Sequence, residues 1–245
     1  VDEPAMLERA VCALQGVTGL PLQLDSSDPA ALERAMRRYN GKPMINSVSA
    51  KAESMAAVFP LVQKYGGVVV GLALDEGGIP ETPEGRVACA ERIYETAAQY
   101  GIVREDVVID TLTLTVSSEP QAAQVTLEAL RRIHARGGRT ILGVSNVSFG
   151  LPAREKVNSA FLTLALEAGL DCAIMNPLSA AMMSAWRAFA VLSARDARCE
   201  DYIAHESGAE TRPQTQAAGM TLGTCIEKGL TDAATNEAKR LVAGG

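Results

Sequence analysis

The stretch RTILGVSNVSFGLP, residues 139–152, decides the fold class of this 245-residue chain. Its first part is an apolar run that predicts a buried strand reaching Asn146. Its second part is small and polar and contains Gly150 and Pro152, which predict a loop. A buried strand that ends on an amide and opens into such a loop is typical of the C-terminal rim of a parallel barrel.

The same unit of strand, loop and helix occurs about six times along the chain. Apolar runs at 20–24, 43–45, 68–74, 107–109, 140–144 and 172–175 alternate with helical patterns at 2–14, 28–39, 51–65, 86–100, 121–135, 155–168 and 186–192. Such alternation needs right-handed parallel crossovers, which allows a doubly wound sheet or a (βα)8 barrel. No unit carries a Gly-x-Gly-x-x-Gly turn, so we favour an α/β TIM barrel. Because six units do not make eight, we expect that the first two strands precede Val1.

The sequence changes character after the expected barrel. Residues 206–219 are rich in Gly, Pro, Gln and Thr, which is typical of a linker. An amphipathic helical pattern then returns. We therefore expect three parts: a barrel domain at 1–205, a linker at 206–219 and a helical tail at 220–245.

Composition excludes several classes of partner. The chain has 23 Lys and Arg against 29 Asp and Glu, and its basic residues cluster only in pairs, which argues against binding to nucleic acid or an anionic membrane. Five scattered cysteines without a CxxC spacing indicate reduced thiols in a cytoplasmic protein, not disulfides or a zinc site. No signal peptide or apolar run of membrane length is present.

The sixth apolar run, 68–74, leads into the acidic pair Asp75-Glu76, which could touch a substrate but fits a solvated loop better. Each of the other five runs ends at or near a single Asp or Asn. These residues are Asp25, Asn46, Asp110, Asn146 and Asn176. In a barrel the strand ends meet at one mouth, so the five side chains would converge there. Each residue singly also fits a plainer role, because Asp and Asn often make turns or cap the following helix.

The residue types of this set restrict the ligand. The strand ends carry no Lys for a Schiff base, and the two histidines lie in a helical pattern and near the linker, so metal-dependent hydrolysis and His acid–base chemistry fit poorly. Carboxylates and amides together suit a neutral heterocycle with a guanidine-like edge, because a carboxylate can accept two N–H donors side by side.

Five segments resemble the pterin-binding methyltransferases. They are LQLDSSD (22–28), KPMINSVSAK (42–51), VVIDTL (107–112), GVSNVSFGLPAR (143–154) and AIMNP (173–177). The family includes the folate-binding module of cobalamin-dependent methionine synthase and the methyltetrahydrofolate:corrinoid methyltransferases. The resemblance covers about residues 1–201 and implies a (βα)8 barrel that binds methyltetrahydrofolate at its C-terminal mouth.

The resemblance also assigns roles to residues. It implies that the pterin ring is hydrogen-bonded by Asp25, Asn46 and Asp110, and that Asn146 lies near N5, the atom that carries the methyl group. Asn146 and Asp110 are thus the expected catalytic residues. Gly143 and Ser145 would let the backbone approach the ring. Further candidate substrate contacts are Arg154 and Asn176.

The expected methyl acceptor is the cobalt(I) of a cobalamin or other corrinoid carried by a partner protein or domain, because this chain has no DxHxxG motif for ligating cobalt. We expect no metal bound by the chain itself. The resemblance also implies a homodimer as one candidate assembly. The tail resembles the first helices of the bundle that precedes a cobalamin-binding domain, although its pattern fits a plain surface helix equally well.

Three other interpretations fit parts of the sequence. Dihydropteroate synthase shares the barrel and the Asp/Asn set, but it needs a basic strand-end motif where this chain has Ser145, Asn146 and Val147. A pterin-binding module without catalysis would follow from an incomplete barrel. An aldolase-type barrel would need a strand-end Lys. The residues leave open whether the final methyl acceptor is homocysteine or an iron–sulfur corrinoid carrier.

Overall fold

The computed structural model describes residues 2–207, 221–223 and 231–243. The chain divides into two compact units, Val1–Leu192 and Ser193–Gly245. The expected linker at 206–219 lies almost wholly outside the described residues. The expected helical tail is described mainly at α10 (Thr231–Ala243).

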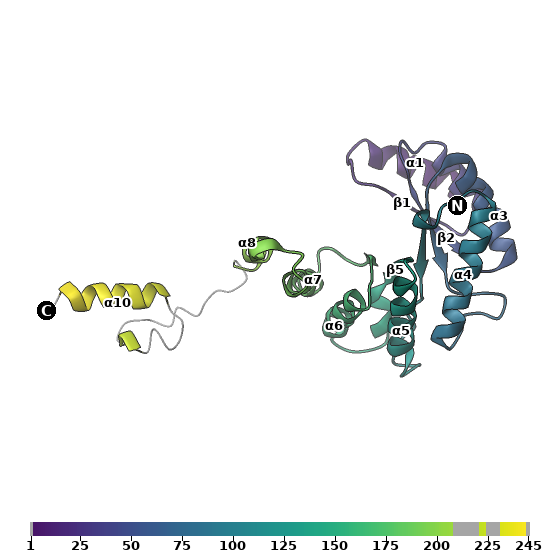
Figure 1. The fold of residues 1–245 in the computed structure, drawn as a ribbon. Coiled ribbons are helices and arrows are strands. Elements are labelled where there is room, and N and C mark those ends of the chain that lie inside the picture. Colours follow the sequence, from purple (N-terminus) through teal and green to yellow (C-terminus); the bar gives the residue numbers. More distant parts are fainter. Residues whose placement is uncertain (1, 208–220, 224–230, 244–245) are drawn as a thin grey trace. The chain divides into compact units, whose positions relative to one another are not determined.

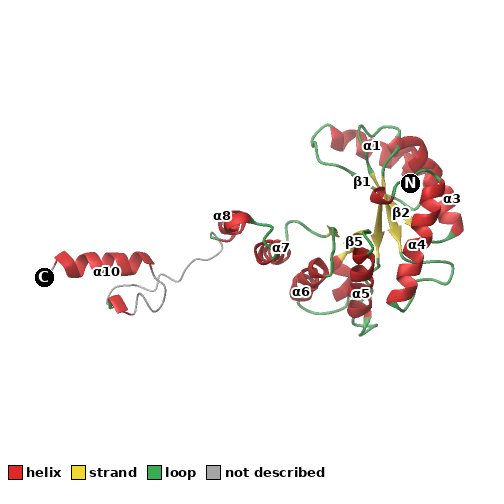
Figure 2. Cartoon of the chain, in the orientation of Figure 1, coloured by secondary structure: helices red, strands yellow, loops and turns green. Residues whose placement is uncertain are grey.

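The first unit is built on six parallel strands that pair in strict chain order. They are β1 (Gln23–Asp25), β2 (Met44–Ser49), β3 (Val68–Leu72), β4 (Val107–Asp110), β5 (Arg139–Gly143) and β6 (Cys172–Ile174). A doubly wound sheet would reverse its strand order at a switch point, and this sheet does not. The sheet is curled, as in part of a barrel, and the helices lie along its outer side (Figures 1 and 2).

A helix follows or precedes each strand. The helices of the first unit are α1 (Glu3–Gln15), α2 (Pro29–Met36), α3 (Ala52–Tyr65), α4 (Pro83–Gln99), α5 (Ala122–Ala135), α6 (Arg154–Glu167) and α7 (Ala180–Leu192). The second unit contains α8 (Glu200–Glu206) before α10. Among the described residues, no helix combines the length and the apolar character that crossing a membrane requires.

Local sequence explains where these helices start and stop. Asp28 caps α2 by accepting a hydrogen bond from the backbone of Ala30, and Thr82 caps α4 in the same way through Gly85. Proline stands at the start of both helices, where its missing N–H costs nothing. The helix α3 ends at Gly66, whose φ of 74° is readily adopted only by glycine.

Side chains alternate between two faces of the sheet, and this alternation positions the site. Leu24, Ile45 and Ile109 pack outward in a core shared with the helices. Val70 and Val108 instead belong to a small cluster on the inner face, together with Ile141. The residue that follows each outward side chain must face inward, because successive strand residues point to opposite faces. This rule places Asp25, Asn46 and Asp110 on the inner face.

The prediction that β5 continues to Asn146 is wrong. The strand ends at Gly143, and Val144–Ser148 form a short 3-10 helix. Val144 and Val147 are both buried in one core cluster with Phe161. A strand would send these two valines to opposite faces, whereas a 3-10 turn aligns residues three apart. Burial of both valines therefore favours the helical turn.

Candidate functional site

The first two strands place a carboxylate beside an amide on the inner face. Asp25 and Asn46 are register partners across the β1–β2 pair. The Asn46 Nδ2 donates a hydrogen bond of 3.2 Å to Asp25 Oδ2. Asp25 is exposed and Asn46 is half-buried, so both keep free hydrogen-bonding capacity toward the open inner face. Asn46 lies within β2 and not at its end, because β2 continues to Ser49.

Asp110, the last residue of β4, is the buried carboxylate of the site. Only 9% of its surface is exposed. Burial raises its pKa from 3.8 to about 6, although the Leu112 N–H and the charge of Arg86 both act to lower it. Leu112 donates that hydrogen bond to Asp110 Oδ1 at 2.7 Å. The site therefore holds two carboxylates in different environments, one exposed and one shielded from water.

Asn146 lies three residues beyond the end of β5, and its side chain rests over Gly143. A Cβ atom added at Gly143 would come within 3.1 Å of Asn146 Nδ2. Such a contact is tighter than a normal van der Waals approach, so a side chain at position 143 would displace the amide. Asn146 itself is exposed. Glycine at 143 therefore allows a free amide group to stand at the mouth, near the end of β5.

Two neighbouring loops of the mouth are tied together around this amide. The hydroxyls of Thr115 and Ser117 both donate to the carbonyl of Phe149, at 2.7 and 2.9 Å. Arg154 folds back onto the same loop, where its Nη2 donates to the Ser145 carbonyl at 2.8 Å. The contacts of Arg154 thus fix the loop that carries Asn146. A direct contact of Arg154 or of Ser145 with a ligand stays a prediction.

Asn176 takes the plainer role that its sequence position left open. Its Oδ1 accepts a hydrogen bond of 3.0 Å from the backbone of Leu178, in the turn before α7. The turn follows β6, whose outer edge has no neighbouring strand among the described residues. Contact between Asn176 and a substrate stays a prediction.

Residues 1–176 match the family model described as pterin binding enzyme. The chain belongs to the pterin-binding enzyme family.

Relatives of this pterin-binding chain fall into two groups. The methionine synthase of Mycobacterium tuberculosis is 35% identical over 189 residues, which cover 71% of this chain but 16% of that protein. A methylcorrinoid:tetrahydrofolate methyltransferase of Eubacterium limosum is 31% identical and is matched over 71% of its length, with 77% of this chain covered. The chain therefore spans less than a fifth of the methionine synthase and most of the second relative.

Solved structures confirm the barrel class. A Yersinia pestis dihydropteroate synthase with a pterine–sulfa conjugate aligns with a TM-score of 0.62 at 16% identity, covering 78% of this chain and 76% of that chain. A second structure of the Yersinia pestis enzyme, with a sulfonamide drug complex, gives a TM-score of 0.63 at 14% identity, covering 77% and 72%. These structures share the fold, and the described residues supply six of the eight strands of such a barrel.

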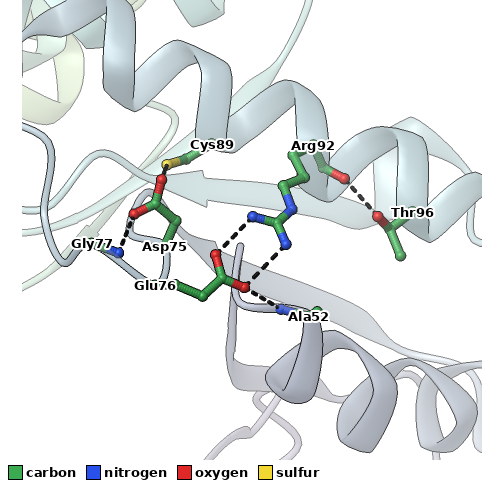
Figure 3. A network of polar contacts seen from close by, with 7 residues as sticks. All are labelled: Ala52, Asp75, Glu76, Gly77, Cys89, Arg92 and Thr96. Carbon is green, nitrogen blue, oxygen red and sulfur yellow. Dashed lines mark hydrogen bonds and ion pairs between the residues drawn. The ribbon is translucent and has the colours of Figure 1, made fainter.

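The loop after β3 carries a polar network of its own in this pterin-binding enzyme. Figure 3 shows the Glu76 carboxylate between α3 and α4, where it accepts hydrogen bonds from the backbone of Ala52 and from Arg92. Asp75 accepts from Gly77 and lies 3.8 Å from the Cys89 sulfur. These two acids, which the sequence left as a solvated loop or a substrate contact, are engaged in holding the loop.

Cys89 is not a nucleophile in this setting. Burial, together with the charge of Asp75, raises the pKa of its thiol to about 11, so the thiol stays protonated at neutral pH. Across residues 2–207, 221–223 and 231–243, no group of three or more His, Cys, Asp or Glu side chains is arranged to hold a metal ion.

Sequence reasoning missed one residue of the site, Arg86. It is 1% exposed and lies in the first turns of α4, within reach of the loop that follows Asp110. One signal was available. A helix N-terminus carries partial positive charge, so a cation four residues after the Thr82 cap is unfavourable there unless something else holds it.

Proposed function

We propose that this chain binds methyltetrahydrofolate and transfers its N5 methyl group to the cobalt(I) of a corrinoid carried by another protein or domain. The observation that carries the proposal is the set of Asp25, Asn46 and Asp110 on one inner face, with the Asn146 amide at the adjoining loop. The names of the relatives support the same chemistry.

The pterin ring fits this donor and acceptor set. Its aminopyrimidinone edge presents N–H groups side by side, as a guanidine does, and an ionised carboxylate can accept two of them. Asp110 is suited to this role because its burial shields the bonds from water, where a hydrogen bond to a charged group is worth roughly 1.5 to 3 kcal/mol. Asp25 and Asn46 would then form hydrogen bonds with the remaining polar atoms of the ring.

Asn146 would act at the methyl-bearing nitrogen. A methyl group on a neutral tertiary amine is a poor electrophile, so N5 must gain a proton before the methyl group can leave. The amide can donate to neutral N5 and, after reorienting, accept from protonated N5. This favours the transition state over the ground state. The proton comes from solvent and stays on N5 of the product, while the reduced corrinoid supplies the electron pair that takes the methyl group.

The remaining assignments belong to the same proposal. The corrinoid would come from a partner or from another domain of a longer protein, since the methionine synthase relative is much longer than this chain. A cytoplasmic location and a homodimer are consistent with the proposal and need separate measurements. The final methyl acceptor beyond the corrinoid stays open between homocysteine and an iron–sulfur corrinoid carrier.

Calorimetric titration with methyltetrahydrofolate tests the pterin site. We expect saturable binding, its loss in Asp110→Ala, and retained binding with slow methyl transfer to cob(I)alamin in Asn146→Ala. The matched control is Asp106→Ala, which removes a carboxylate just before the opposite end of β4 that pairs with Lys42. A folded sample that binds no pterin, or an Asp110→Ala variant that binds as well as the parent chain, would refute the proposal.

The same titration separates the alternatives. Binding of methyltetrahydrofolate without any transfer to cob(I)alamin would favour a pterin-binding module that does no catalysis. Dihydropteroate synthesis is the weaker alternative, because its structures share only the fold with this chain and because position 146 holds Asn where a basic motif is needed.

A further inference from the structure

Arg86 is the largest side chain that is fully buried in the first unit among the described residues. Its Nη1 donates to the carbonyls of Thr111 and Leu112, both at 2.8 Å, and to the Thr126 hydroxyl at 2.9 Å. Its Nε donates to the Pro80 carbonyl at 3.0 Å. One arginine on α4 therefore holds the loop after β3 and the loop after β4 at the same time.

The loop after β4 is the one that orients Asp110. Leu112 has a φ of 61°, a left-handed conformation that costs a residue with a side chain roughly 1 kcal/mol or more. Its carbonyl accepts from both Arg86 and Thr126, while its N–H donates to Asp110 Oδ1. These three bonds together keep the unfavourable conformation in place. Without these bonds the loop can relax, and Asp110 then loses the Leu112 N–H donor that fixes the orientation of its carboxylate.

The charge of Arg86 adds to this arrangement. Within the part of the chain that the structure describes, its hydrogen bonds go to carbonyls and a hydroxyl and to no carboxylate. A buried cation needs compensation, and Asp110 is the charged group that interacts with it at longer range. The positive charge of Arg86 lowers the pKa of Asp110 and so favours its ionised form, whereas burial raises this pKa.

We infer that Arg86 is a positioning residue for pterin recognition: by holding Thr111 and Leu112 it sets the Asp110 carboxylate to accept the donors of the pterin ring. The inference rests on the proposed function, since it takes Asp110 as the group that binds the ring. Arg86 itself needs no contact with the substrate, because its hydrogen bonds are made within the protein.

Three variants separate positioning, charge and stability. Arg86→Met removes both the bonds and the charge, and Arg86→Lys keeps the charge but lacks the planar fork that reaches several carbonyls. The control is Arg92→Met on the same helix, whose partner is Glu76 in the neighbouring loop. Each variant is examined in two ways: the pKa of the Asp110 carboxyl by carbon-13 NMR without ligand, and the Kd for methyltetrahydrofolate by calorimetry.

We expect Arg86→Met to raise the Asp110 pKa above about 6 and to weaken pterin binding at least tenfold at pH 7.5. Arg86→Lys should leave that pKa close to the parent value and still weaken binding severalfold. Arg92→Met should change neither. A folded Arg86→Met variant with an unchanged pKa and unchanged Kd overturns the inference, and so does full affinity in Arg86→Lys, because charge alone would then suffice.

A fourth variant, Thr126→Val, covers the case in which Arg86→Met does not fold. Thr126→Val removes the hydroxyl that joins Arg86 to the Leu112 carbonyl and keeps the charge of Arg86. We expect severalfold weaker binding with the Asp110 pKa near its parent value, and unchanged affinity would count against the inference. Should the parent chain bind no methyltetrahydrofolate while Arg86→Met still raises the Asp110 pKa, the proposed function fails and the electrostatic interaction between Arg86 and Asp110 stands.

Discussion

Pterin binding by this chain should weaken as the pH falls through about 6, because Asp110 must be ionised to accept two N–H donors. Burial raises the pKa of Asp110 to about 6. The protonated carboxyl has lost an acceptor site and gained a donor, so it pairs poorly with the ring. One pH unit below the pKa only about a tenth of the carboxyl is ionised, and the affinity should then be about tenfold lower, or about 1.4 kcal/mol.

Calorimetric titration with methyltetrahydrofolate at pH 5, 6, 7 and 8 measures this dependence. The Kd should be flat above pH 7, about twice as high at pH 6 and about tenfold higher at pH 5. The control is Asp110→Asn, which should bind weakly and lose this dependence, so that titration of the ligand is accounted for. Equal affinity at pH 5 and 7 in the parent chain, or the same fall in Asp110→Asn, would refute the role given to Asp110.

Two further predictions follow from the same geometry. Asp110→Asn should stabilise the ligand-free fold at neutral pH. The pKa of Asp110 in the folded state lies above the ordinary 3.8, so the folded state binds more protons than the unfolded state between about pH 4 and 6. The free energy of unfolding of the parent chain therefore falls by up to about 3 kcal/mol as the pH rises through that window, and the variant avoids this loss. Urea unfolding at pH 4 and 7.5 checks this, and the idea fails if the variant gains nothing at pH 7.5. Gly143→Ala should slow methyl transfer by about tenfold while changing the Kd much less, because its Cβ would push against Asn146 Nδ2; single-turnover transfer to cob(I)alamin is the measurement, and an unchanged rate would contradict the placement of Asn146.

The order of strands and helices could be predicted from the sequence because the signals are local. Apolar runs such as Val68–Leu72 and the cap Asp28 act within a few residues, whereas the helix expected at 86–100 begins earlier, at Pro83. The apolar runs that stop at Asp25 and Asp110 are enough to place both carboxylates at strand ends. The 3-10 turn after Gly143 could not be predicted, since it depends on a core that Val144 and Val147 share with side chains of the three helices α5, α6 and α7.

The sequence placed the polar residues of the candidate site but did not decide which of them bond to the protein backbone. Asn46 meets Asp25 across the β1–β2 register, although it lies within β2 and not at the strand end where the sequence placed it. Asn176 makes a turn, and Arg154 turns back onto its own loop. Each of these outcomes was compatible with the sequence, because an Asp or Asn after a strand can serve a ligand or the backbone, and only the surrounding atoms decide between them.

The sequence by itself determined the parallel α/β architecture, the strand-end positions of Asp25 and Asp110, and the likeness to pterin-binding enzymes, because residue spacing and motif order carry that information. Only the tertiary structure decided that Asp110 is buried enough to have a pKa near 6 and that Arg86 holds the loop beside it. Burial and long-range hydrogen bonds depend on which segments come together in space. Arg86 and Leu112 are 26 residues apart in the chain, and no local pattern joins them.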